Sequence, residues 1–394
     1  MNENKPLWVR DKNELNKEDY QDFYKAVFKE NSNPLTWSHF KTEGDADFTA
    51  LLYVPERANF DQFDKFYEKK AQVKLFVRRV LINDEFEDLL PKYLNFMKGI
   101  VDSDSLPLNV NRENLQQRKT LGTIGNKLLK KAVDMLVAFN PEPESEEDEL
   151  FAEDEEDKSY EEEGFASKRE KEIDTFNKFW KNYNKNIKLG MIEDDDNRKK
   201  LSVLTRWYTT NNVTELTSLD DYISRMKEGQ KHIYFLGGED KNTLQHSPLI
   251  ERLVSEGYEV ILGDDPLDET IFTVFKEYNS YRIVNVARND FKEPYKTDAE
   301  RKEVKYLKTE FQPLIDYAKK ELSEDIKDVK ISLRLVNNPV TIVSDMNNAT
   351  PNRERLEEAA ALRQQFKYGK EKNIMEINPH HPMIQELNKI VEVI

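Results

Sequence analysis

The chain has 394 residues, no cysteine and a formal net charge of −16 at pH 7. The lack of cysteine excludes a disulfide framework and a thiolate zinc site, and no apolar run approaches the roughly 18 residues of a membrane-spanning helix. Charged residues make up 35% and hydrophobic residues 38% of the chain. We therefore expect about two to four domains with very polar surfaces and no membrane span.

Residues 6–138 are predicted to form a first α/β unit. Apolar residues recur at helical spacing over residues 16–30, and residues 48–54 have the pattern of a strand that ends at a proline. The clearest strand pattern is VKLFVRRVLI at residues 73–82, followed by an amphipathic helix predicted over residues 86–97. Helices that flank strands favour a layered α/β domain.

Two features of this unit bear on function. Arg78 and Arg79 are adjacent within an apolar strand, so they need either ionic partners or a solvent-facing end; a structural ion pair and a site role explain them equally well. The stretch LPLNVNRENLQQRK at residues 106–119 predicts a helix start, with Asn109 at its mouth. Arg112 and Gln116 are four residues apart and share one helix face. A guanidinium beside amides suits a phosphate, although a solvated arginine is the commoner outcome of this pattern.

A low-complexity acidic segment is predicted between residues 139 and 172. Residues 142–163 contain fourteen Asp or Glu and a single Lys, so most of the net charge lies there and the rest of the chain is nearly neutral. Self-repulsion and the scarcity of apolar residues predict a disordered insertion. Clustered carboxylates can also bind Ca²⁺ weakly, but their spacing matches no EF-hand loop.

Residues 173–225 are predicted to be helical connectors. They carry an aromatic stripe at helical spacing, which we interpret as core, and the helix is expected to break at residues 186–190. The stripe consists of Phe176, Phe179, Trp180 and Tyr183.

Residues 226–295 have the β-α-β-α-β order of a short parallel sheet. Gly237 and Gly238 follow its first strand, but no G-x-G-x-x-G motif is present, so they indicate tight packing rather than a nucleotide site. The predicted strands are 232–236, 259–262 and 282–286, with helices at 247–256 and 268–278.

Residues 296–394 form the last predicted domain. The final helix is apolar along its length and is expected to expose Ile384, Leu387 and Val391 to a missing continuation. The predicted elements are helices at 305–322, 353–366 and 382–393 and strands at 329–335 and 340–344.

Long segments of the chain resemble the heat-shock protein 90 chaperone family. They are PLWVRDK, LFVRRVLINDEFEDLLPKYLNFMKGIVDSDSLPLNVNRENLQQRK, NIKLGMIEDDDNRKKL, LTSLDDYISRMKEGQKHIYFLGGE and EINPHHPMIQEL. PKYLNF, KLGMIED and SRMKEGQKHIYF look most like the family's endoplasmin branch. The resemblance implies a multi-domain α/β protein with a middle domain and most of a C-terminal domain. The N-terminal nucleotide-binding domain and the final dimerisation helices are expected to be missing.

The resemblance also implies roles for single residues. Arg112 matches the arginine that contacts the ATP γ-phosphate, and Asn109 and Gln116 match its supporting polar residues. Arg78 matches an arginine near the contact with the N-terminal domain. Two further residues match apolar positions of the middle domain that bind clients, namely Trp8 and Phe60. ATP with Mg²⁺ is expected mainly on the missing domain, so the parent protein is expected to be an ATPase and this fragment alone to be inactive.

The partners implied are the protein's own N-terminal ATPase domain, client proteins for folding under stress, and co-chaperones, with no nucleic acid. The full-length protein is expected to be a homodimer and the fragment monomeric. The endoplasmic reticulum lumen is the expected location, compatible with N-x-T sequons at Asn212 and Asn348; the cytoplasm or another organelle is the alternative. A stand-alone acidic interaction or calcium-buffering protein without ATPase coupling is the competing function.

Overall fold

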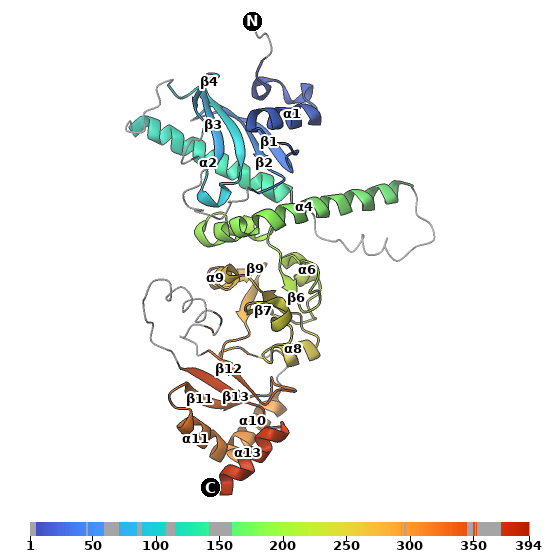
Figure 1. Cartoon of the computed structure of the whole chain (residues 1–394), viewed down its shortest axis with the longest axis vertical. Helices are drawn as coiled ribbons and strands as arrows, with labels where there is room; N and C mark the ends of the chain where they lie inside the picture. Colours follow the sequence, from blue (N-terminus) through green and yellow to red (C-terminus); the bar gives the residue numbers. More distant parts are fainter. Residues whose placement is uncertain are drawn as a thin grey trace. The chain divides into compact units, whose positions relative to one another are not determined.

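The computed structural model describes residues 5–44, 46–58, 71–84, 89–107, 115–141, 160–292, 294, 297–344, 350, 352 and 372–393. The chain divides into two compact units, Met1–Thr205 (unit 1) and Arg206–Ile394 (unit 2), which are described separately (Figure 1). Both units combine helices with a β-sheet, which confirms the predicted α/β class. Within the described residues, no helix has the length and apolar character needed to cross a membrane.

A five-stranded sheet in the order β1-β2-β5-β3-β4 forms the centre of unit 1. Neighbouring strands are antiparallel, except that β3 and β5 are parallel. β2 matches its prediction, whereas β1 and β5 were not predicted. The strands are β1 (Thr36–Thr42), β2 (Phe48–Val54), β3 (Gln72–Val77), β4 (Val80–Asn83) and β5 (Lys98–Ser103).

Helix α1 (Lys17–Phe28) confirms the helix predicted over residues 16–30, and Asn16 and Asp19 form a capping box at its start. Its buried face packs with Trp8 against β2 and β5. Helix α2 (Leu115–Ala138) packs against β1 and β2. Short 3₁₀ turns precede α1, namely η1 (Leu7–Val9) and η2 (Lys12–Glu14).

Two predictions in unit 1 are wrong. Residues 73–82 do not form one strand, because the chain reverses at Arg78 and Arg79 and returns as β4. Residues 89–97 of the helix predicted over 86–97 contain only the 3₁₀ turn η4 (Lys92–Leu94), which leads directly into β5; residues 85–88 lie outside the described part.

Helix α4 (Tyr160–Glu193) runs without the break predicted at residues 186–190 and is followed by α5 (Arg198–Ser202). Gly190 is required for packing, because a Cβ there would lie 2.7 Å from the ring of Tyr93. The predicted aromatic core stripe is confirmed, since all four rings are buried. The helix begins at Tyr160, inside the segment predicted to be disordered; residues 142–159 lie outside the described part.

The sheet of unit 2 has the order β6-β8-β7-β10-β9. Its three central strands, β8, β7 and β10, are parallel as predicted, and a short antiparallel strand flanks each side. The strands are β6 (Tyr208–Thr209), β7 (His232–Gly237), β8 (Ile261–Gly263), β9 (Glu277–Tyr278) and β10 (Tyr281–Asn285). The helices are α6 (Leu219–Ser224), α7 (Lys241–Leu244), α8 (Glu251–Ser255) and α9 (Pro266–Val274).

The carboxyl ends of parallel strands usually form the ligand crevice of an open α/β sheet. Here the buried carboxylate of Glu269 accepts hydrogen bonds at this edge from Asn285 (3.2 Å), Asn352 (3.0 Å) and the hydroxyl of Thr350. A Cβ at Gly238 would lie 2.5 Å from Leu244. The protein's own side chains therefore fill this crevice, in agreement with the packing role predicted for Gly237 and Gly238.

The C-terminal part of unit 2 is a three-stranded sheet, in the order β11-β13-β12, covered by helices. The single helix predicted over 305–322 is two helices that meet at Phe311, because a proline opens the second one. Residues 353–366 lie outside the described part. The elements are α10 (Asp298–Glu310), α11 (Gln312–Glu321), β11 (Ile326–Ile331), β12 (Val340–Val343), β13 (Asn373–Ile377) and α13 (Pro382–Val393).

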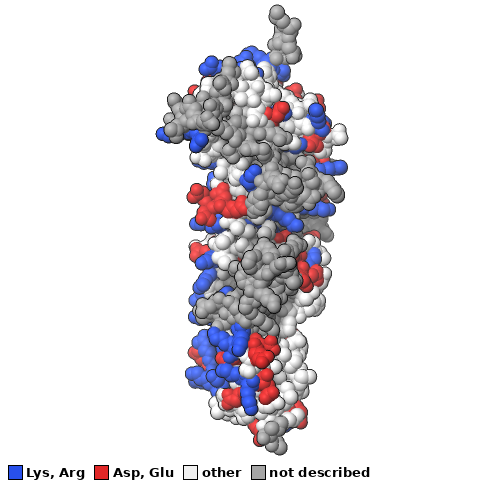
Figure 2. Space-filling view, turned by 60° about the vertical axis from the view of Figure 1, so that its left-hand side comes forward, with Lys and Arg blue, Asp and Glu red and all other residues white. Residues whose placement is uncertain are grey.

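Figure 2 shows Lys and Arg side chains gathered with carboxylates over this C-terminal part. Helices α10 and α11 carry as many acidic as basic residues, which is the pattern of a solvated surface rather than of a basic groove. One face of the final helix, α13, is buried and the other is exposed. Ile384 is only 3% exposed, so the prediction that Ile384 faces outward is wrong. Met383, Leu387 and Ile390 are exposed.

Arg334 connects the three-stranded sheet to the five-stranded one within unit 2. It is 2% exposed, and its Nε lies 3.0 Å from Glu376 Oε2 on β13, at an angle unsuited to a hydrogen bond, so the attraction is chiefly ionic. Its Nη1 donates to the carbonyl of Val286 (2.8 Å), just beyond β10, and its guanidinium lies 5.3 Å from the centre of the Phe291 ring. One buried cation thus contacts both sheets.

We predict that Arg334→Ala destabilises unit 2 by about 3–5 kcal/mol, because it leaves the carboxylate of Glu376 buried without a counter-charge. Arg301→Ala, which removes an exposed arginine paired with Asp298, is the matched control and is expected to change stability little. Urea unfolding, followed by hydrogen exchange at β13, measures both. Equal stability of the two variants would contradict a structural role for the buried pair.

Candidate functional site

The turn between β3 and β4 is the first element of the candidate site. Arg78 and Arg79 have φ values of 50° and 67°, the left-handed conformation that two-residue hairpin turns require. This conformation costs non-glycine residues roughly 1–2 kcal/mol each. The N–H of Arg78 donates to the carbonyl of Ser103 (3.3 Å), and the N–H of Arg79 donates to Asp102 Oδ1 (3.1 Å). Both side chains are exposed, so the pair has a solvent-facing end.

Asp102, near the end of β5, is the second element. It is 9% exposed, and its Oδ2 accepts a hydrogen bond from Trp8 Nε1 (2.9 Å). Trp8 is itself buried, and its ring lies 4.9 Å from Phe76 and 5.9 Å from Phe23, centre to centre. A buried tryptophan N–H needs an acceptor, and the carboxylate that satisfies it also holds the arginine turn.

A hydrogen-bonded series connects Trp8 to α1. The carbonyl of Trp8 lies 3.0 Å from His39 Nε2, and His39 Nδ1 lies 3.0 Å from the hydroxyl of Tyr20. Burial lowers the pKa of His39, so the ring is neutral at pH 7. Because a carbonyl can only accept, Nε2 carries the proton and the hydroxyl of Tyr20 donates to Nδ1.

The start of the predicted phosphate-binding stretch is anchored at the same place. Ser103 Oγ donates to the carbonyl of Asp47 (3.0 Å), and the N–H of Asp47 donates to Ser105 Oγ (2.9 Å). Leu106 is 1% exposed. The residues that directly follow β5 are therefore held in place beside the arginine turn. The next described element of the chain is α2.

A cavity of about 570 Å³ opens beside these residues. Trp8, His39, Arg79 and Asp102 line it. Its other charged lining residues are Arg10, Asp11, Lys12, Lys41 and Asp104. Charges of both signs suit a polar or zwitterionic group rather than a simple anion. Within the described residues, no group of three or more His, Asp or Glu side chains is placed to hold a metal.

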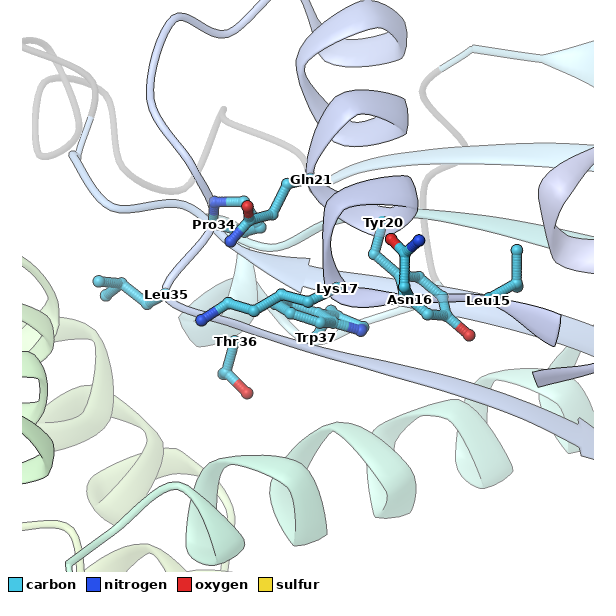
Figure 3. A pocket seen from close by; sticks show the side chains of 9 residues that line it. All are labelled: Leu15, Asn16, Lys17, Tyr20, Gln21, Pro34, Leu35, Thr36 and Trp37. Carbon is cyan, nitrogen blue, oxygen red and sulfur yellow. The ribbon is translucent and has the colours of Figure 1, made fainter. Parts of the chain in front are cut away.

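A second hollow, of about 610 Å³, lies between the start of α1 and β1 (Figure 3). The rings of Tyr20 and Trp37 are stacked in it, 5.5 Å apart, beside the side chain of Lys17. Asn16 already accepts the hydrogen bond of the Asp19 N–H, so this helix start offers little to an anion. The hollow is a half-apolar surface groove.

The predicted site residues are only partly within the described chain. Asn109, Arg112 and Phe60 lie outside it, and Gln116 lies in the first turn of α2, without a described side chain. Arg78 is exposed in the hairpin turn.

Trp8, predicted to contact clients, is instead buried against Asp102. Asp102, His39 and Tyr20 were not predicted as site residues from the sequence. The one signal for them was that a buried tryptophan N–H needs an acceptor.

Comparison with known proteins places the chain in a family. A family model described as Hsp90 protein matches residues 1–393. The middle domain of a Plasmodium falciparum heat shock protein superposes with a TM-score of 0.55 at 29% identity, covering 71% of this chain and 99% of that one. The fold is thus that of a heat shock protein middle domain with further elements attached.

The chain belongs to the Hsp90 protein family, as its sequence segments predicted. It is 42% identical to the endoplasmin homologues of Arabidopsis thaliana (98% of this chain, 46% of that protein), Catharanthus roseus (99% and 47%) and Hordeum vulgare (98% and 47%). The likeness to the endoplasmin branch is therefore confirmed. The chain spans about half the length of these relatives.

Proposed function

We propose that this chain is the ATPase-coupling segment of an ATP-dependent molecular chaperone. In this proposal, Arg112 reaches the γ-phosphate of ATP held by the protein's own N-terminal domain. The observation that carries it is the placement of the exposed Arg78–Arg79 turn beside the anchored start of the loop that contains Arg112. Family membership supports it.

Each site residue has a distinct role in this proposal. Arg112 neutralises charge that develops on the transferred phosphoryl group, and Asn109 and Gln116 orient its guanidinium. Arg78 faces the N-terminal domain, where an exposed cation favours docking of a nucleotide-loaded surface. ATP with Mg²⁺ supplies the phosphoryl chemistry on that other domain.

Client proteins and co-chaperones are the further proposed partners, in protein folding under stress. Trp8 offers clients little surface because it is buried, so we assign it the role of hydrogen-bond donor to Asp102. Phe60 remains a proposed client contact. The calcium-buffering alternative rests on residues 142–163, of which 142–159 lie outside the described part, and family membership favours the chaperone function over it.

Arg112→Ala in the full-length protein is expected to lower kcat for ATP hydrolysis by roughly 10³-fold or more with little change in nucleotide affinity, because an arginine supplied across an interface acts on the transition state. Arg112→Lys should rescue poorly, since an ammonium lacks the planar fork. Gln116→Ala should cost less, because an amide orients rather than neutralises charge.

Steady-state ATPase assays, with circular dichroism of each variant, test this expectation. Residues 1–394 assayed alone are the negative control. A folded Arg112→Ala protein that retains wild-type kcat would refute the proposed role and favour Arg78 instead.

We propose that the full-length protein is a homodimer and that residues 1–394 are monomeric. The exposed apolar surface of α13 includes Met383 (58%), Leu387 (41%) and Ile390 (49%), a small strip for a stable interface. Sedimentation equilibrium at micromolar concentration should give the monomer mass. A tight dimer would contradict this and show that residues 1–394 already contain a sufficient interface.

We propose the endoplasmic reticulum lumen as the location, because the similar plant proteins are named endoplasmin homologues. The side chain of the sequon residue Asn212 is half-buried and hydrogen-bonded to Glu215 (2.9 Å), so we expect it to remain unglycosylated. Fractionation of the full-length protein, with glycosidase treatment, measures both; recovery in the cytosol would exclude the lumen.

A further inference from the structure

We propose that Asp102 is a positioning residue that fixes the base of the loop carrying Arg112. The proposal rests on the function proposed above and adds to it the residue that sets the geometry. In this role, Asp102 acts on the reaction only through the arginine turn and the start of the loop.

Asp102 and Ser103 hold the two strained amides of the turn. Consecutive non-glycine residues in the left-handed region persist only where surrounding contacts over-determine them. Here the N–H of Arg79 is bound by the Asp102 carboxylate and that of Arg78 by the Ser103 carbonyl. Asp102 and Ser103 are the last two residues of β5, the strand that leads into the loop. The hydrogen bonds to them therefore tie the arginine turn to the base of the loop.

Only a carboxylate satisfies both neighbours of this position. Oδ1 receives the N–H of Arg79 and Oδ2 receives the indole N–H of Trp8. An ionised aspartate is an acceptor at both oxygens, whereas an asparagine of the same shape presents an NH₂ group to one of the two donors. The Asp102→Asn variant therefore places two donors face to face in a buried site.

A series of hydrogen bonds that begins at Tyr20 on α1 holds Asp102 in position. The hydroxyl of Tyr20 donates to His39, and His39 donates to the carbonyl of Trp8, whose indole donates to Asp102. Every bond in this series points toward the carboxylate, which is its last acceptor. These hydrogen bonds thus connect the base of the loop to Tyr20, a buried residue of α1.

The experiment measures ATPase activity of the full-length protein with Asp102→Asn, Trp8→Phe and the double variant. Asp102→Asn is expected to lower kcat roughly ten- to a hundredfold with an unchanged KM for ATP, because a misplacement of about 1 Å costs this much in a positioned site. Trp8→Phe removes the opposing donor, so the double variant should recover part of the lost kcat.

Two controls separate positioning from folding. Asp84→Asn makes the same chemical change at an exposed aspartate of the same hairpin, bound to Lys74, and should leave kcat unchanged. Arg79→Gly keeps the N–H that Asp102 binds and should preserve the hydrogen-exchange protection of residues 103–107, which Asp102→Asn should reduce.

Wild-type kcat and unchanged exchange in a folded Asp102→Asn protein, alongside a strongly reduced kcat in Arg112→Ala, would overturn the positioning role and leave the proposed function standing. Wild-type kcat in Arg112→Ala would instead overturn the proposed function. Equal losses in Asp102→Asn and the double variant, without recovery, would also overturn the role, since they show no coupling to Trp8.

Discussion

The carboxylate of Asp102 accepts one hydrogen bond from the indole of Trp8 and one from the backbone of Arg79. The candidate site of unit 1 depends on these two hydrogen bonds. The hairpin turn keeps a conformation that arginine disfavours, and the side chains of both arginines are exposed. The strand that carries the carboxylate then passes directly into the loop of the proposed arginine. The sheet thus fixes the base of the proposed site, because a positioned cation needs a rigid support.

In unit 2, buried charged side chains hold distant segments of the chain together. Arg334 and Glu376 join its two sheets, and Glu269 occupies the edge at which an α/β sheet commonly receives a ligand. A buried ion needs a partner of opposite charge or several hydrogen bonds, so each of these side chains ties together segments distant in sequence. These contacts hold the small parallel sheet to the neighbouring segments of unit 2.

Periodicity identified the elements whose character is local. α1, β2, the aromatic stripe of α4 and the three parallel strands were predicted because alternation or helical spacing was clear in each. The hairpin at Arg78 was missed because neither turn residue is glycine, asparagine or aspartate, the usual signal of a left-handed turn. The helix predicted over residues 86–97 was wrong because an apolar run alone does not separate a helix from a 3₁₀ turn followed by a buried strand.

By itself, the sequence determined the α/β class, the acidic character of one segment and, through its long matching segments, the family. These depend on composition, local pattern and extended similarity, all of which exist before the chain folds. Only the tertiary structure decided that Trp8 is a buried donor, that Asp102 is its acceptor and that the arginine turn adjoins the start of the loop. The hydrogen bond between Trp8 and Asp102 joins residues 94 positions apart. No local pattern encodes such a pairing, because it arises only when the sheet has placed both residues in the same interior.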